Sequence, residues 1–287
     1  MSTNEPAEQP PLSPGKVFAQ AVAKEGAKAS VEFSHTITEA FPGFKRRPRI
    51  AVRGLFKVVK AEGGKVKYWH ETPPQSPPTV QVEDVGLRPE AAFEFHTDLA
   101  TLKPTTAWIQ VPPALLDDPE TLATFIDFRL LVRLCTAENQ ALARGRGGDR
   151  VRGLLETPGI TRLPARSDPV SSLLAACDRV EQMGGSADGI LVNPADYYRY
   201  FVGKGGLLSD LTSMGVRIAR ARMVDPGQVI VGDFTAAATI FDSGRSSIRF
   251  ATPPPGIFPR DGLAVCGEIH EALVVHLPTH FYVASLA

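Results

Sequence analysis

Residues 49–100 limit the possible folds of this chain more than any other stretch, because strand-forming residues there surround a proline-dense centre. RIAVRGLFKVV (49–59) and KVKYWH (65–70) are rich in β-branched and aromatic residues, and the Gly63-Gly64 pair between them favours a hairpin. The ETPPQSPPTV segment that follows leaves no room for regular structure. Loops of this length are uncommon inside compact domains and are usually functional or disordered. We therefore expect an extended arm.

The arm is too apolar to remain covered by solvent alone. A projecting segment buries little within its own domain, so its backbone groups and apolar side chains need a partner surface. A head-to-tail contact of this kind is heterologous, and heterologous contacts close into rings or shells or run open. We predict a clasp between subunits, formed by Val52, Leu55, Phe56, Tyr68, Trp69 and Arg88.

A long helix follows the arm. Asp118 is a good N-cap, Pro119 suits the first helical position and Glu120 favours the positive end of the helix dipole. Apolar residues then recur at helical spacing as far as Ala141, and Gly145 ends the pattern. The spacing predicts a single helix over 119–144.

The remaining sequence alternates between helical and strand patterns, which predicts a mixed α+β fold. Residues 1–15 indicate a flexible arm, and residues 16–41 carry a weak helical pattern interrupted by Gly26. Further helices are expected after Asp168 and after Asn193. The expected strands are 91–97, 105–111, 189–192, 216–222, 228–234, 237–241, 246–250, 263–277 and 280–286.

Composition argues against several classes of function. The 31 basic and 31 acidic residues cancel, whereas a protein that wraps nucleic acid over its whole surface is usually basic. The three cysteines show no CxxC spacing, and the six histidines are scattered, so we expect no metal and no cofactor. No catalytic constellation emerges, and we do not expect an enzyme. No apolar run is long enough to span a bilayer, so we expect a cytoplasmic protein without a membrane partner.

Six segments, in order, resemble those of one family. They are LATLKPTTAWIQVPPALLDD (99–118), FIDFRLLVRLCTAENQAL (125–142), GLLETPGI (153–160), GILVNPADYYRY (189–200), GQVIVGDFTAAATIFDSG (227–244) and GLAVCGEIHEALVVHLPTHFYVASL (262–286). In this combination the chain resembles the Hong Kong 97-type major capsid proteins, a family that includes the encapsulins. The resemblance covers residues 83–287, and before residue 83 it concerns architecture alone.

The resemblance implies an α+β capsid fold with four parts. These are an N-terminal arm (1–48), an extended loop (49–100), a peripheral domain with a long spine helix and a β-sheet (101–168 and 251–287), and an α/β axial domain (169–250). It also implies that Gly203, Lys204, Gly205 and Gly206 line a pore on a five-fold axis. A surface turn without contacts is the alternative for this glycine-rich segment.

Some capsids of this family form a Lys–Asn cross-link assisted by a glutamate. Here Glu268 stands at the glutamate position, but Arg88 and Asp261 stand where the lysine and asparagine are needed. A guanidinium stays protonated and cannot serve as the amine nucleophile, so we predict no cross-link. A small shift in alignment would leave Lys65 or Lys67 as alternatives. The basic FKRRPR segment (44–49) is consistent with contact to nucleic acid or with a solvated hinge.

Two kinds of shell compete as the expected function, and a soluble non-shell protein is the third alternative. About 45 residues precede the arm, without a long coiled coil, which favours an encapsulin that encloses a cargo enzyme. The alternative is a tailed-phage or prophage capsid that encloses DNA. In both shells the main partner is another copy of the chain.

Overall fold

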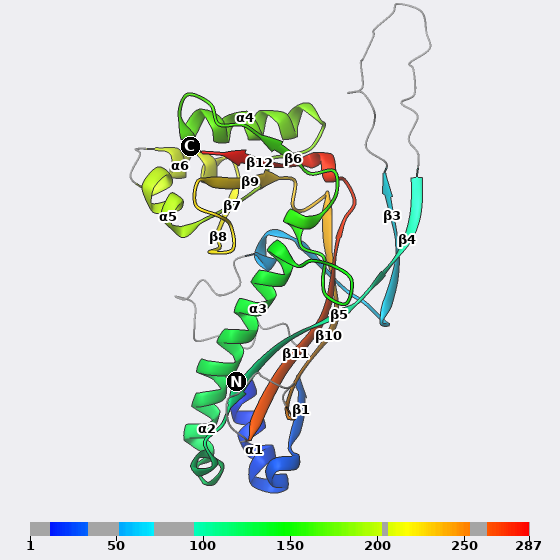
Figure 1. Cartoon of the computed structure of the whole chain (residues 1–287), viewed down its shortest axis with the longest axis vertical. Helices are drawn as coiled ribbons and strands as arrows, with labels where there is room; N and C mark the ends of the chain where they lie inside the picture. Colours follow the sequence, from blue (N-terminus) through cyan, green and yellow to red (C-terminus); the bar gives the residue numbers. More distant parts are fainter. Residues whose placement is uncertain (1–11, 34–51, 72–94, 203–205, 253–262, 287) are drawn as a thin grey trace, which may run out of the picture. The chain divides into compact units, whose positions relative to one another are not determined.

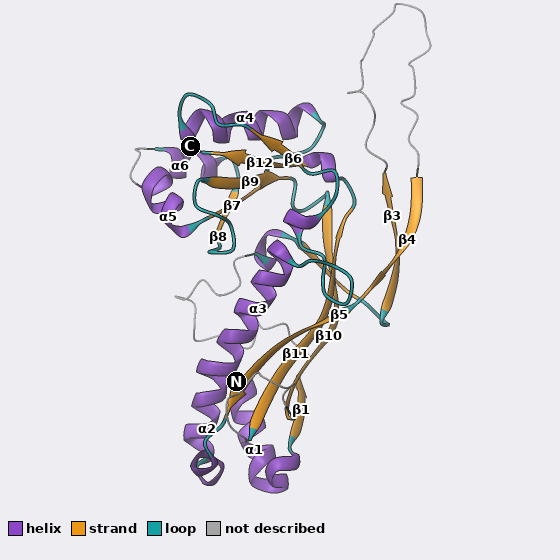
Figure 2. Ribbon diagram, in the orientation of Figure 1, coloured by secondary structure: helices purple, strands orange, loops and turns teal. Residues whose placement is uncertain are grey.

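The chain folds into two compact units. This computed structural model describes residues 12–33, 52–71, 95–202, 206–252 and 263–286. The first unit comprises residues 1–47, 106–135 and 245–269, and the second comprises residues 48–105, 136–244 and 270–287. Helices and strands occur in both units, which confirms the predicted α+β class (Figure 1; Figure 2).

The described elements follow one another in a mixed order. The helices are α1 (Pro14–Glu25), α2 (Pro119–Phe125), α3 (Leu131–Arg144), α4 (Pro169–Gln182), α5 (Pro194–Asp196) and α6 (Leu207–Ser213). The strands are β1 (Ser30–Phe33), β2 (Lys57–Lys60), β3 (Lys65–Glu71), β4 (Phe95–Thr101), β5 (Lys103–Gln110), β6 (Thr161–Leu163), β7 (Gly189–Val192), β8 (Arg217–Arg220), β9 (Gln228–Gly232), β10 (Ala238–Phe250), β11 (Ala264–Val275) and β12 (Phe281–Ser285). None of these helices has both the length and the apolar character that a membrane span requires.

The predicted long helix is present in the sequence range that the capping residues indicate. The Asp118 side chain accepts a hydrogen bond from the Thr121 N–H at 3.1 Å, and α2 begins at Pro119. A π-helical turn, Ile126–Leu130, joins α2 to α3, which ends at Arg144. The helix over 119–144 is therefore confirmed, with an internal change of hydrogen-bond register that apolar spacing does not reveal.

In the first unit, α1 crosses α2 at close range. A Cβ atom on Gly15 would lie 2.3 Å from the Ala123 carbonyl oxygen, so only glycine fits at the crossing. The Gly15 N–H donates to the Asp127 carboxylate at 2.8 Å, and Phe18 and Val22 are buried. The helical pattern predicted over 16–41 holds only as far as Glu25, where α1 ends; Ser30–Phe33 form strand β1 instead, and residues 34–41 lie outside the described ranges.

A five-stranded sheet lies at the centre of the second unit, in the order β6-β12-β9-β7-β8. Alternate residues of its strands point to opposite faces and enter two different apolar cores. Leu191 and Ile230 join the core that contains Leu142 of α3, whereas Ile190 and Val231 join the other core. Helix α4 packs along β12 and β9 on that other face (Figure 1).

A pair of glycines lets aromatic rings pack against this sheet. Gly189 and Gly232 are directly paired on β7 and β9. A Cβ atom on either would lie within 2.4 Å of the ring of Phe234 or Phe281. These two rings meet edge to face at 5.2 Å, so the glycines leave the space that the aromatic pair fills.

The predicted hairpin around Gly63-Gly64 is wrong. Strand β2 pairs in parallel with β10, where Lys57–Lys60 lie opposite Thr239–Asp242. Strand β3 pairs with β4 instead, so the two strand-forming runs belong to different sheets. The two strands expected over 237–241 and 246–250 are one continuous strand, β10.

The grouping of strands also differs from the division into peripheral and axial domains. That division assigns residues 161–163 and 281–285 to the peripheral domain. In the structure, β6 and β12 belong to the same sheet as β9, β7 and β8, which fall in the range assigned to the axial domain. The C-terminal strand therefore completes a sheet whose other strands come earlier in the chain.

Candidate functional site

The β3–β4 hairpin is a largely exposed part of the second unit. The two strands pair from Lys65 opposite Thr101 to Glu71 opposite Phe95. They form a two-stranded sheet that pairs with no other strand of the described chain (Figure 2). Isolated two-stranded sheets are marginally stable in water, so a second surface would stabilise this one.

One face of the hairpin carries an exposed apolar pair. Trp69 and Leu99 lie on the same face at diagonal positions, with 59% and 60% of their surfaces exposed. Lys65 and Lys67 are on that face too and are exposed. Large apolar side chains held open on a strand face are typical of interaction surfaces.

The opposite face of the hairpin contacts the body of the second unit. The Tyr68 ring lies 6.2 Å from the ring of His276, which follows β11. His276 Nδ1 lies 3.0 Å from the Trp69 carbonyl oxygen, and Nε2 lies 3.1 Å from Thr239 Oγ1. Because a carbonyl oxygen only accepts, Nδ1 carries a proton. His276 therefore joins the hairpin to β10.

The first described residues of the arm, 52–56, form the arm root, and their positions differ from the predicted clasp. Val52, Leu55 and Phe56 are 0%, 2% and 6% exposed and belong to the apolar core of the second unit. The Phe56 ring packs 5.1 Å from Phe234. Side chains enclosed to this extent have no surface left for a neighbouring subunit, so the prediction is wrong for these three residues. Their apolar character reflects burial in their own chain.

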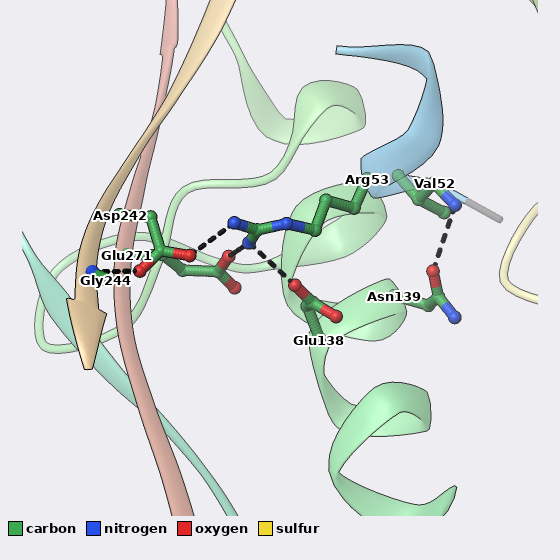
Figure 3. Close-up of polar contacts among 7 residues, drawn as sticks. All are labelled: Val52, Arg53, Glu138, Asn139, Asp242, Gly244 and Glu271. Atoms are coloured by element: carbon green, nitrogen blue, oxygen red, sulfur yellow. Dashed lines mark hydrogen bonds and ion pairs between the residues drawn. The ribbon is translucent and has the colours of Figure 1, made fainter. Parts of the chain in front are cut away.

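Arg53, at the same root, is the centre of a buried polar cluster that sequence analysis missed (Figure 3). Its guanidinium donates to Glu138 of α3 at 2.9 Å, to Glu271 of β11 at 3.1 Å and to Asp242 of β10. The neighbouring Val52 N–H donates to the Asn139 side chain at 3.0 Å. Three segments far apart in sequence, α3, β10 and β11, are thus tied to the start of the arm.

The cluster contains more carboxyl groups than cations. Glu138 Oε2 and Glu271 Oε1 are buried without a hydrogen-bond partner among the described residues. Burial raises the pKa of Glu138, although Arg53 opposes the shift. Burial and then the neighbouring Glu138 hold the pKa of Glu271 well above its ordinary value. The folded chain therefore favours the protonated form of Glu271 more than the unfolded chain does.

Several residues singled out in the sequence lie outside the described ranges. Gly203, Lys204, Gly205, Arg88 and Asp261 belong to this group. Gly206 is described: it has a φ of +90° and immediately precedes α6, which suits a glycine.

Glu268, considered above for cross-linking, pairs with Arg249 at 3.2 Å. Each of the two is partly exposed. Glu268 thus has a polar contact within its own unit.

The comparisons with known proteins agree on the fold. No protein-family model matches the chain. The major capsid protein of Enterobacteria phage HK97 is 25% identical over 252 residues, which cover 83% of this chain. The chain spans 64% of the length of that relative.

Solved structures give likenesses at lower identity. A virus-like particle from Pyrococcus furiosus matches with a TM-score of 0.56 and 14% identity, over 80% of this chain and 90% of the other. The capsid of a native GTA particle matches with a TM-score of 0.57 and 16% identity, over 84% and 91%. A chain from Mycobacterium phage Ogopogo matches with a TM-score of 0.60 and 15% identity, over 83% and 92%. The chain therefore has the Hong Kong 97-type major capsid protein fold, which the six segments in their order along the sequence predict.

Proposed function

We propose that this chain is a shell subunit, which assembles with copies of itself into a closed container. The observation that carries the proposal is the hairpin face on which Trp69 and Leu99 are 59% and 60% exposed. The same function is supported by a curated relative named as a major capsid protein. It is also supported by the structural similarity to a virus-like particle and to a GTA capsid.

The proposed contact is heterologous. The hairpin of one subunit lies on a different surface of its neighbour, and repetition of such a contact around an axis closes a ring or shell. Trp69 and Leu99 supply the apolar centre, and Lys65 and Lys67 supply charged groups beside it. Tyr68 takes a supporting role, because its ring faces His276. Arg88 remains a proposed clasp residue outside the described ranges.

Two kinds of shell are candidates, and they differ in what they enclose. A phage or prophage capsid that encloses DNA is supported by the curated relative, which matches 83% of this chain. An encapsulin that encloses a cargo enzyme in the cytoplasm is supported by the likeness to the virus-like particle of Pyrococcus furiosus. We favour the capsid, because the chain is 25% identical to the phage capsid protein but 14% identical to the virus-like particle protein. Nucleic acid inside purified particles would support the capsid, and a co-purified enzyme would support the encapsulin.

A pore around Gly203, Lys204, Gly205 and Gly206 remains part of the proposal. Lys204→Glu would reverse the charge at such a pore without changing the hairpin. We expect altered passage of charged solutes into assembled particles and unchanged assembly. If charged solutes enter the variant particles as fast as the unmodified ones, this turn does not line a pore.

A double substitution tests the shell function directly. Trp69→Ser with Leu99→Ser removes the exposed apolar pair and leaves the buried cores untouched. Loss of a central interface residue weakens association by about 2 kcal/mol or more, which is roughly 30-fold per contact. Light scattering and negative-stain microscopy should therefore find a folded subunit that does not form particles.

Leu174→Ser supplies the matched control, because Leu174 is 49% exposed on α4. This variant should assemble as the unmodified chain does. Intact particles from the double variant at normal yield would refute the role of the hairpin face.

A further inference from the structure

A cavity of about 320 Å³ opens in the second unit, away from the hairpin contact. Its lining includes Thr136 and Asn139 of α3 together with Tyr198. Arg220, at the end of β8, and Arg222, just beyond it, also line the cavity. The volume falls within the range of small-ligand sites.

The charge of the cavity is positive. Two guanidinium groups line it, and no acidic side chain does so among the described residues. The acids nearby are engaged elsewhere: Asp225 pairs with Arg144 at 2.6 Å, and Asp196 accepts from the Gly227 N–H at 2.7 Å. An anion entering the cavity therefore meets arginine without competition from a lining carboxylate.

Arg220 is held in place before any ligand arrives. Its guanidinium carbon lies 5.0 Å from the centre of the Tyr197 ring and 5.8 Å from that of Tyr198. One nitrogen donates to the Tyr198 hydroxyl at 2.8 Å. Because a guanidinium has five N–H donors, this bond leaves donors for a ligand. An arginine already ordered in this way loses less conformational entropy on binding.

Tyr198 adds a second recognition element. Its side chain is 58% exposed beside the two arginines, so part of the ring remains open to solvent. An exposed tyrosine ring next to guanidinium groups provides a stacking surface for a planar base, and guanidinium groups bind phosphate through paired hydrogen bonds. Phosphate alone would use the arginines and leave the ring unused.

We propose that this cavity binds a nucleotide, with the phosphate on Arg220 and Arg222 and the base against Tyr198. This site shares no residue with the hairpin that carries the proposed shell contact. The same chemistry is available from a free nucleotide or from an unpaired nucleotide of a single-stranded nucleic acid.

Titrations of the full-length chain with AMP, adenosine, inorganic phosphate, an oligo(dA) strand and polyglutamate test the site. Isothermal titration calorimetry at low salt reports each affinity. We expect AMP to bind more tightly than adenosine or phosphate, because only AMP uses both the arginines and the ring. Binding of the oligonucleotide at least as tightly as AMP would identify nucleic acid as the source, and tighter binding of AMP would identify a free nucleotide.

Arg222→Ala should weaken AMP binding about tenfold or more, since it removes a charged hydrogen-bond donor. Arg222 is exposed, so the variant should fold. Tyr198→Ala should weaken AMP binding and leave phosphate binding unchanged. Arg199→Ala is the matched control, because Arg199 is an exposed arginine that lies over Tyr200 and does not line the cavity.

Three results in these titrations would overturn the proposal outright, and a fourth would contradict the role of the ring. In the first, neither AMP nor the oligonucleotide binds. In the second, Arg199→Ala and Arg222→Ala lose AMP affinity equally. In the third, polyglutamate binds more tightly than either nucleotide ligand. Equal affinities for AMP and inorganic phosphate would also contradict it, because they would leave the ring without a function.

Discussion

Replacement of Arg53 by methionine is the sharpest perturbation of the buried cluster. Methionine keeps an unbranched apolar chain of similar length and removes the charge. The change leaves the carboxyl groups of Glu138, Asp242 and Glu271 without the cation to which all three are bonded. The Glu138 and Glu271 side chains are 2% and 0% exposed, so water cannot replace the lost donor.

Two lines of reasoning give the same magnitude for the loss. Removal of one partner from a buried ion pair destabilises a protein by about 3–5 kcal/mol. A carboxyl group could instead take up a proton, and for an ordinary glutamate pKa of about 4.3 this costs about 3.7 kcal/mol at pH 7. At pH 5 the same protonation costs about 1 kcal/mol. We therefore expect Arg53→Met to lower the free energy of unfolding by about 4 kcal/mol at pH 7, and by about 2–3 kcal/mol less at pH 5.

Urea denaturation at both pH values, at one protein concentration, measures this difference. Arg249→Met is the matched control, because the Arg249–Glu268 pair is 45% and 16% exposed at its two side chains. Exposed pairs contribute about 0–1 kcal/mol, so this variant should lose little stability. Equal losses for the two variants at pH 7, or a loss for Arg53→Met that does not change with pH, would refute the reasoning.

Glu271, Gly232 and the buried cysteines each give a measurable effect. The folded state raises the pKa of Glu271, so above the ordinary pKa of about 4.3 this group holds more protons in the folded than in the unfolded chain. The free energy of unfolding therefore falls as the pH rises above about 4.3, by up to about 1.4 kcal/mol per pH unit. Glu271→Gln should flatten this slope in urea titrations. Gly232→Ala places a Cβ atom 2.3 Å from the Phe281 ring and should lower the free energy of unfolding by about 1–3 kcal/mol. Burial raises the pKa of the Cys177 and Cys266 thiols to about 11, so iodoacetamide at pH 8 should label both far more slowly in the folded chain than in urea.

Local signals in the sequence were sufficient for the helices that begin at Pro119 and Pro169. Asp118 and Asp168 each precede a proline and cap the helix that follows, and both caps are present in the structure. These signals operate within one turn of helix, so the rest of the fold does not alter them. The π-helical turn Ile126–Leu130 was not predictable, because apolar spacing is nearly the same with or without it.

Strand pairing was less predictable, because it depends on residues far apart in the chain. Gly63-Gly64 favours a local hairpin, yet β2 finds its partner in β10, about 180 residues later. The apolar residues Val52, Leu55 and Phe56 posed a related difficulty. Hydrophobicity indicates that a side chain will be buried, but it does not say whether the covering surface belongs to the same chain or to a neighbour.

The Arg53 cluster shows what a sequence signal for a buried site could look like. Arg53 lies inside the otherwise apolar segment AVRGLF, and Glu271 immediately precedes the apolar residues ALVV. A charged residue inside such a segment is seldom buried without a partner, so the two positions are candidates for pairing with each other. The involvement of Glu138 and Asp242 depends on how α3 and β10 meet the arm root, which no local pattern encodes.

Assembly itself gives the most direct test of the central claim. Purified full-length chain should sediment as large closed particles, visible by electron microscopy, at concentrations where the Trp69→Ser, Leu99→Ser variant remains a single subunit. A stable monomer or dimer of the unmodified chain across a range of pH and salt would contradict the proposal that this fold builds a shell.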